Sequence, residues 1–398
     1  MKIESCPTSP TSPTSPKGPT SPTCLTSPTS LTSPTSPKSP KSPTSPTNNY
    51  KLNMKKILFL IAVIFLLLSC TKEETVTKYN NNPHDNFDAL WEILDERYCY
   101  FSYKNIDWNE VYNEFSPRVN KVKDIFQLFD LMAEMIDTLE DGHVNLYTPF
   151  DVSSCTGWFD SYPADYNTNF LSKHFDSEPR IAGGFAYTTL QNGKVGYIRY
   201  SSFSEGFTAA NLVYIDAYFH QLNKVEGIII DVRNNGGGSL SYSERLASCF
   251  FNEKTTTGYM RHKTGKCHDC FSDPTPIVTD PADAPIDWSD KRVIVLSNRR
   301  CYSATNDFIV RMKQAPNVVI IGGITGGGGG MPLSQELPNG WMIRFSAVPM
   351  YDANMQHTEF GVMPDIEAHI SPDDTDDSIL LTAIHELKTE GINSQFLQ

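Results

Sequence analysis

The sequence predicts an α/β fold with a mainly parallel or mixed sheet, preceded by a small helical unit. Two observations predict it. From about residue 194, short apolar runs alternate with segments that repeat their apolar residues at helical spacing. Between residues 84 and 140, helical spacing occurs without strand-like runs, in two sets: Phe87, Leu90, Trp91 and Leu94, then Ile125, Leu128, Phe129, Met132, Ile136 and Leu139.

In the C-terminal part, Gly227 to Val232 is a continuous apolar run, which is typical of a strand buried on both faces. We expect a helix near Ser241, where Ser241-x-x-Glu244 matches a capping box. Residues 150–190 show no clear period. Further strands are expected at 195–200, 293–296 and 318–321, further helices at 208–222 and 303–314, and a strand pair around 340–345 near the site.

The N-terminal region, up to about residue 83, is not expected to belong to the folded part of the chain. Residues 1–53 are Thr-Ser-Pro repeats, which cannot fill a core and are either disordered or not native. Residues 54–70 resemble a bacterial lipoprotein signal peptide, with two lysines, an apolar run and Ser69 before Cys70. We therefore expect Met54 to be the true start and Cys70 to carry the lipid. A linker over 71–83 would follow.

Composition excludes some partners. The formal net charge is −13 and no basic cluster follows Lys56, so nucleic acid is not an expected partner. Nine cysteines are present. Cys267 and Cys270 enclose a histidine, but no second pair follows. A local disulfide or two free thiols is therefore favoured over a metal site, and we expect neither metal nor cofactor.

Three polar features could carry chemistry. Residues 231–238 follow a buried strand with three glycines, either as a plain tight turn or as a source of amide donors for an anion. Ser303 opens a helix after a strand, where it could be an N-cap or a nucleophile with the amide of Ala304 nearby. His143 follows a helix through a glycine turn, either as a structural residue or as a general base.

Together these residues resemble the C-terminal-processing and tricorn-core serine peptidase family, over roughly Phe87 to Ile370. The resemblance implies a crotonase-like (ClpP/crotonase) core of ββα units over 191–398, a helical cap over 84–150, and a connecting segment over 151–190. It rests on five motifs in family order: Asp141-Gly142-His143, Ile230 to Gly238, Tyr302-Ser303-Ala304, Ile321 to Gly327, and Glu359 to Ile366.

The resemblance also implies a site. In the tricorn-like branch, a histidine from the helical unit activates the serine, and a glutamate near the C-terminus assists the histidine. Ser303 would thus be the nucleophile and His143 the general base. Glu359 would favour the imidazolium, directly or through a bridge. The amides of Gly237 and Ala304 would form the oxyanion hole.

Three departures from the family pattern stand out. The lysine of the processing branch is replaced by Gly328, so its Ser-Lys dyad is absent. The serine that precedes the histidine in the tricorn-like branch is Gly142 here. Residues 150–190 are too few for the PDZ domain that many members carry.

We therefore expect a serine peptidase that acts on peptides or unfolded proteins. It would be held in the cell envelope of a Gram-negative bacterium through a lipid on Cys70. Two alternatives stay open, namely an inactive peptide- or ligand-binding lipoprotein on the same fold, and an esterase-like hydrolase.

Overall fold

The computed structural model describes residues 79–221, 225–282 and 286–395. The predicted signal peptide, with Cys70 and Met54, and most of the predicted linker lie outside these residues. The described residues belong to one compact unit. None of their helices is both long and apolar enough to cross a membrane.

The helical region forms as the periodicity predicts, with local caps at its helix starts. The side chain of Asn82 caps α2, that of Asp107 caps α4 and that of Asp124 caps α5, each by accepting a hydrogen bond from an amide of the first turn. Two short helices were not predicted, α3 and α4. The elements are α2 (Pro83–Arg97), α3 (Phe101–Lys104), α4 (Trp108–Phe115), η1 (Ser116–Lys121) and α5 (Ile125–Asp137).

This helical region shares its hydrophobic core with strands from the other end of the sequence. Phe87, Leu90 and Met132 are fully buried in one cluster with Ile343 and Phe345. These last two residues belong to β11 (Met342–Asp352), the long strand of a five-stranded antiparallel sheet. The other strands of that sheet are β1 (Asn145–Tyr147), β6 (Thr255–Met260), β7 (Thr275–Thr279) and β10 (Gly330–Glu336).

A seven-stranded mixed sheet forms the second layer, in the order β12-β9-β8-β5-β4-β3-β2. The five strands from β12 to β4 run parallel, and β3 and β2 add antiparallel at one edge. The strands are β2 (Arg180–Ala182), β3 (Phe185–Leu190), β4 (Val195–Tyr200), β5 (Gly227–Asp231), β8 (Arg292–Ser297), β9 (Val318–Gly322) and β12 (Ile366–Glu367).

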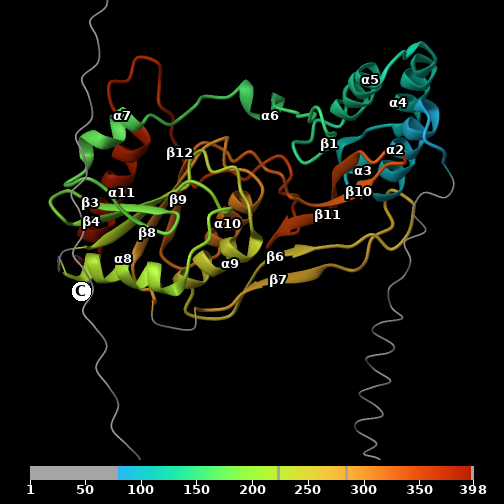
Figure 1. Ribbon diagram of the computed structural model, residues 1–398. Coiled ribbons are helices and arrows are strands. Elements are labelled where there is room, and N and C mark those ends of the chain that lie inside the picture. The colour runs from blue at the N-terminus through green and yellow to red at the C-terminus, as the bar shows by residue number, and fades with distance from the viewer. Residues whose placement is uncertain (1–78, 222–224, 283–285, 396–398) are drawn as a thin grey trace, which may run out of the picture. The chain divides into compact units, whose positions relative to one another are not determined.

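Both faces of this sheet are covered, as the apolar run in β5 predicts. Ile228 and Ile230 pack into one core cluster, and Ile229 between them packs into another. The first face is covered by α8 (Ala209–Gln221), α9 (Leu240–Ala247), η3 (Ser248–Phe250) and α10 (Ala304–Met312); the second is covered by α11 (Ser378–Gln395) and α7 (Thr168–Leu171) (Figure 1).

Two details differ from expectation. Helix α9 begins at Leu240 with Ser239 at the N-cap, so the predicted capping box at Ser241 is wrong. Residues 150–190 also contain more structure than their sequence indicates: α6 (Gly157–Asp160), α7, η2 (Ser172–His174), β2 and β3. Their elements are short and irregular, so no period emerges from the sequence.

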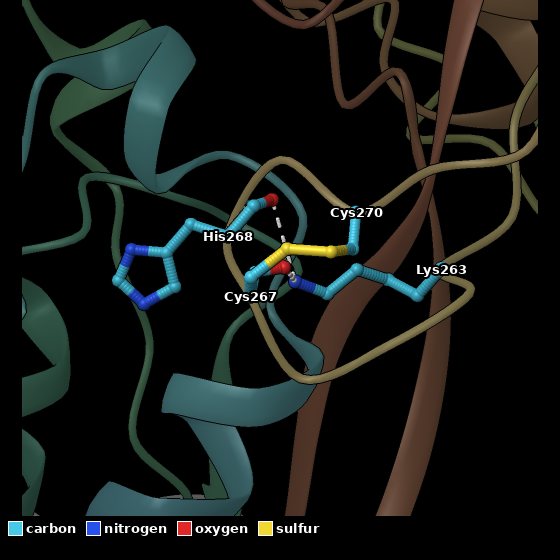
Figure 2. The surroundings of a disulfide bond; sticks show 4 residues. All are labelled: Lys263, Cys267, His268 and Cys270. Atoms are coloured by element: carbon cyan, nitrogen blue, oxygen red, sulfur yellow. Dashed lines mark hydrogen bonds between the residues drawn. A yellow bond between two sulfur atoms is a disulfide. The ribbon is translucent and has the colours of Figure 1, made fainter.

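The loop between β6 and β7 contains the cysteine pair, which forms a disulfide between Cys267 and Cys270 (Figure 2). The Nζ atom of Lys263 donates to the carbonyls of Cys267 and His268, at 2.8 and 3.3 Å. The ring of His268 lies 2.9 Å from a carboxylate oxygen of Asp95 on α2 and packs against Phe101. The loop thus contacts the helical region.

Candidate active site

Ser303 lies between β8 and α10 in a backbone conformation that serine rarely adopts. Its φ and ψ are 57° and −119°; it occupies the N-cap position of α10, as predicted, but its side chain makes no capping hydrogen bond. Such a conformation costs about 1–3 kcal/mol and persists only where neighbours enforce it. Here the Ser303 amide donates to the carbonyl of Gly327 at 2.9 Å, and its carbonyl accepts from Asp307.

Gly237 packs directly against the backbone of Ser303. A Cβ atom at position 237 would lie 2.6 Å from the carbonyl oxygen of Tyr302 and 3.0 Å from the Ala304 amide, so only glycine allows this approach. The two predicted oxyanion-hole residues are therefore adjacent to Ser303. The Gly237 amide, however, donates to Oδ1 of Asn235 at 3.0 Å. An oxyanion at this position would have to share or displace that bond.

His143 and Ser303 line the same cavity of about 150 Å³. Burial, together with the charge of Arg344 in the same cavity, lowers the pKa of His143 to about 4, against the opposing effect of Asp141. The imidazole is therefore neutral at pH 7, as a general base must be. Both ring nitrogens are buried without a hydrogen-bond partner among the described residues. The ring packs beside Tyr302, with 4.9 Å between centroids.

The turn that places His143 is fixed by Asp141. One carboxylate oxygen of Asp141 accepts the amide of His143 at 2.8 Å, and the other accepts the hydroxyl of Tyr98 at 3.0 Å. Glu140, just before it, takes a positive φ of 45°. In the sequence, Asp141 stands out only as part of the Asp141-Gly142-His143 motif. Its role as the acceptor that shapes the turn is visible only in the three-dimensional contacts.

Glu359 is buried near this turn, and its contact is with a lysine. Oε1 of Glu359 lies 2.9 Å from Nζ of Lys104 at the end of α3, and the backbone of Gly329 also favours the ionised carboxyl, while Oε2 has no hydrogen-bond partner among the described residues. The structure therefore pairs Glu359 with Lys104 and gives it no hydrogen bond to His143. Burial, reinforced by Asp141 and opposed by Lys104, raises the pKa of Glu359 to about 8.

Two aromatic side chains explain the glycines at positions 142 and 328. A Cβ on Gly142 would lie 2.7 Å from the indole nitrogen of Trp158 and 2.8 Å from the Tyr302 hydroxyl, so the serine of the tricorn-like pattern has no room. A Cβ on Gly328 would lie 2.5–2.8 Å from the Tyr302 ring, and the φ of Gly328 is +71°. The lysine of the processing branch is excluded there for the same reason.

Trp158 and Lys104 are the site residues that sequence reasoning missed. Trp158, on α6 of the connecting segment, stacks on Tyr302 with centroids 4.2 Å apart. Its carbonyl accepts from the guanidinium of Arg299, which lies four residues before Ser303. A lone tryptophan in an irregular segment and a lone lysine after an aromatic run carry no recognisable signal in one sequence.

The cavity beyond Ser303 is mainly apolar, with the guanidinium of Arg344 among its polar groups. Over the described residues, no three His, Cys, Asp or Glu side chains come together as a metal site. A peptide side chain without charge would fit these walls better than an ionised one. The apolar lining residues are Leu240, Ile277, Val310, Met331, Pro332 and Met350.

Comparisons with known proteins show that the chain belongs to peptidase family S41, a family of serine peptidases. The family model matches residues 194–368, and the model of the tricorn protease C1 domain matches residues 79–137. A crystal structure of a candidate peptidase from Parabacteroides merdae is 43% identical, covering 78% of this chain and 98% of its own, with a TM-score of 0.73.

A more distant structure shares the fold. Mature CPAF complexed with lactacystin is 14% identical, covering 79% of this chain and 99% of its own, with a TM-score of 0.58. The search of curated proteins gives no match. The family match and the two similar structures confirm the predicted crotonase-like α/β core with an N-terminal helical region. The catalytic roles of Ser303, His143, Glu359, Gly237 and Ala304 stay predictions.

Proposed function

We propose that this protein is a serine peptidase in which Ser303 attacks a peptide carbonyl and His143 takes its proton. The observation that carries the proposal is the strained Ser303, placed in one cavity with a neutral histidine whose ring nitrogens have no hydrogen-bond partner among the described residues. As the bond from Oγ to the carbonyl carbon forms, the hydroxyl proton moves to the imidazole. The C–N bond of the peptide then breaks as its nitrogen takes that proton from the imidazolium and leaves as an amine, and water hydrolyses the acyl-enzyme.

The oxyanion would be stabilised beside Ser303 by the Ala304 amide at the start of α10 and by the Gly237 amide. The start of a helix favours negative charge, and removing one such donor costs about 10²–10³ in rate. For Gly237 to act, its amide must release Oδ1 of Asn235, a rearrangement that substrate binding would have to drive.

The substrates we propose are peptides or unfolded proteins, because the cavity accepts an uncharged side chain and the family consists of peptidases. We also propose that the protein is held in a Gram-negative cell envelope by a lipid on Cys70. That proposal is supported by the sequence around Cys70 alone, which lies outside the described residues.

A fluorophosphonate probe tests the serine chemistry. We expect the purified protein, as residues 71–398, to be labelled at Ser303. Ser303→Ala should abolish labelling, and His143→Ala should slow it by at least ~10²-fold. A panel of denatured proteins and small esters then separates peptidase from esterase activity. Absence of Ser303-dependent labelling would contradict both enzyme functions and leave the inactive binding protein.

A further inference from the structure

The lysine at the end of α3 has its three ammonium hydrogens fully used inside the protein. The side chain of Lys104 is only 4% exposed. Its Nζ lies 2.9 Å from Oε1 of Glu359 and donates to the carbonyls of Leu139 and Glu140, each at 3.1 Å. An ammonium group has three donors, so these three acceptors fix its position.

The three acceptors lie in or next to the two segments proposed to assist Ser303, namely the turn that carries His143 and the segment that carries Glu359. Leu139 and Glu140 directly precede the turn in which Asp141 holds the amide of His143. Asp141 itself places a carboxylate oxygen 3.8 Å from Nζ of Lys104. Glu359 comes from the C-terminal part of the chain. Lys104 therefore connects the helical region, the histidine turn and the glutamate.

We propose that Lys104 is a positioning residue of the active site, which acts through Glu359 by favouring the ionised form of its carboxyl group and holding it beside the turn that carries His143. The inference rests on the proposed function of Ser303 and His143. One feature separates it from a purely structural ion pair: Oε2 of Glu359 and both ring nitrogens of His143 are buried and lack partners among the described residues. A carboxylate with a vacant oxygen can stabilise the imidazolium directly or through water.

Charge balance explains why the lysine is needed. Two carboxylates, Asp141 and Glu359, are buried around one cation, and a buried carboxylate without compensation takes up a proton. Burial would lower the pKa of Lys104, but the two carboxylates raise it, so the lysine stays charged. Burial raises the pKa of five other titratable groups near Glu359, and the charge of Glu359 raises each pKa further: Tyr98, Cys99, Tyr100, Tyr103 and Tyr302.

Loss of Lys104 should shift the pH dependence of Ser303 labelling to higher pH. Lys104 lowers the pKa of Glu359, which stands at about 8. Removing the positive charge raises this pKa further, so less Glu359 is ionised near neutral pH. For each unit by which the pKa of Glu359 rises, its ionised fraction at a pH below that pKa falls about tenfold. If the carboxylate assists proton transfer to His143, the rate of Ser303 labelling should rise with Glu359 ionisation.

The experiment measures fluorophosphonate labelling rates between pH 6 and 9.5 for wild type, Lys104→Met and Lys104→Arg. We expect the wild-type rate to rise with a midpoint near pH 8. Lys104→Met should move that midpoint up by at least one unit and slow labelling about tenfold at pH 7.5. Lys104→Arg, which keeps the charge, should keep the midpoint. Lys121→Met, at an exposed lysine of the same region, is the matched control and should behave as wild type.

Glu359→Gln makes the test specific. If Lys104 acts through Glu359, the double variant Lys104→Met/Glu359→Gln should label as fast as Glu359→Gln alone, and both should lack the rise near pH 8. The double variant has the same net charge at this cluster as the wild type with Glu359 ionised, so it serves if Lys104→Met does not fold.

Two results would overturn the inference: a Lys104→Met profile that is lower but has an unchanged midpoint, or a double variant clearly slower than Glu359→Gln. Failure of the proposed function itself looks different, because the wild type would then not be labelled at Ser303 at all.

Discussion

Gly142 shows how one residue is determined by side chains far away in the sequence. Its missing side chain leaves room for the Tyr302 hydroxyl and the Trp158 indole nitrogen. The two aromatic rings are themselves stacked, so neither can move aside without losing contact with the other. The departure from the tricorn-like pattern at this position is therefore matched by its neighbours. It does not by itself indicate a lost site.

Gly142→Ser restores the residue of the tricorn-like pattern, but we expect it to harm this protein. Inserting atoms into a packed site costs about 1–3 kcal/mol, so the free energy of unfolding should fall by that amount, measured by urea denaturation. Labelling of Ser303 should slow as well, because the displaced Tyr302 directly precedes the nucleophile. Trp158→Ala/Gly142→Ser is the control, and it should label faster than Gly142→Ser. A single variant as stable and as reactive as wild type would refute the steric explanation.

At the scale of elements, the loop between β6 and β7 links two regions that the sequence presents as separate. Its disulfide joins Cys267 and Cys270 (Figure 2). Between these cysteines, the ring of His268 contacts Asp95 of α2. Lys266 of the same loop forms an ion pair with Glu96. Strand β6, where the loop starts, contributes Thr257 and Gly258 to the cavity lining. The loop thus connects the helical region to a wall of the cavity.

We expect the Cys267→Ser/Cys270→Ser variant to fold but to be less stable by about 2 kcal/mol, because the disulfide closes a very short loop. Chemical denaturation of the variant and of the wild type with and without reductant measures this. Reductant should have no effect on the variant, which is the control for the remaining free cysteines. A loss well above this estimate would mean that the disulfide also supports the contact of His268 with α2.

The elements that the sequence predicts well are those with a strong period or a long apolar run. Strands β4, β5, β8 and β9 and helices α2, α5, α8 and α10 all lie within a few residues of their expected positions. The connecting segment was not predicted because its elements are short. Its position depends on donors elsewhere, such as Arg233 and Asn298, which bind the carbonyls of Asp165 and Ala164.

At the scale of the whole molecule, the helical region and the C-terminal strands bury one common core. Trp108 and Phe101 lie in the same cluster as Trp341 and Ile343. The N-terminal part therefore brings Lys104 and His143 to a site whose proposed nucleophile, Ser303, follows β8.

The proposed membrane anchoring concerns the whole protein, and it can be tested in cells. Expressed from Met54, the protein should incorporate an alkyne-tagged fatty acid and fractionate with membranes. Cys70→Ala should lose both the label and the membrane fraction, while Cys155→Ala, at a half-buried thiol, should keep both. Label that persists in Cys70→Ala would exclude this cysteine as the lipidated residue.

The sequence by itself determined the fold class, the order of the core strands along the chain, and the identity of Ser303, His143 and Glu359 as candidates. It could do so because apolar periodicity and glycine-rich turns are local properties, and because five motifs occurred in family order. Only the tertiary structure decided the partners of these residues. Glu359 meets Lys104, Tyr302 and Trp158 fill the space beside Gly142, and Asn235 holds the Gly237 amide. These contacts join residues that are mostly distant in the sequence, and burial sets their electrostatic strength, so no local pattern contains them.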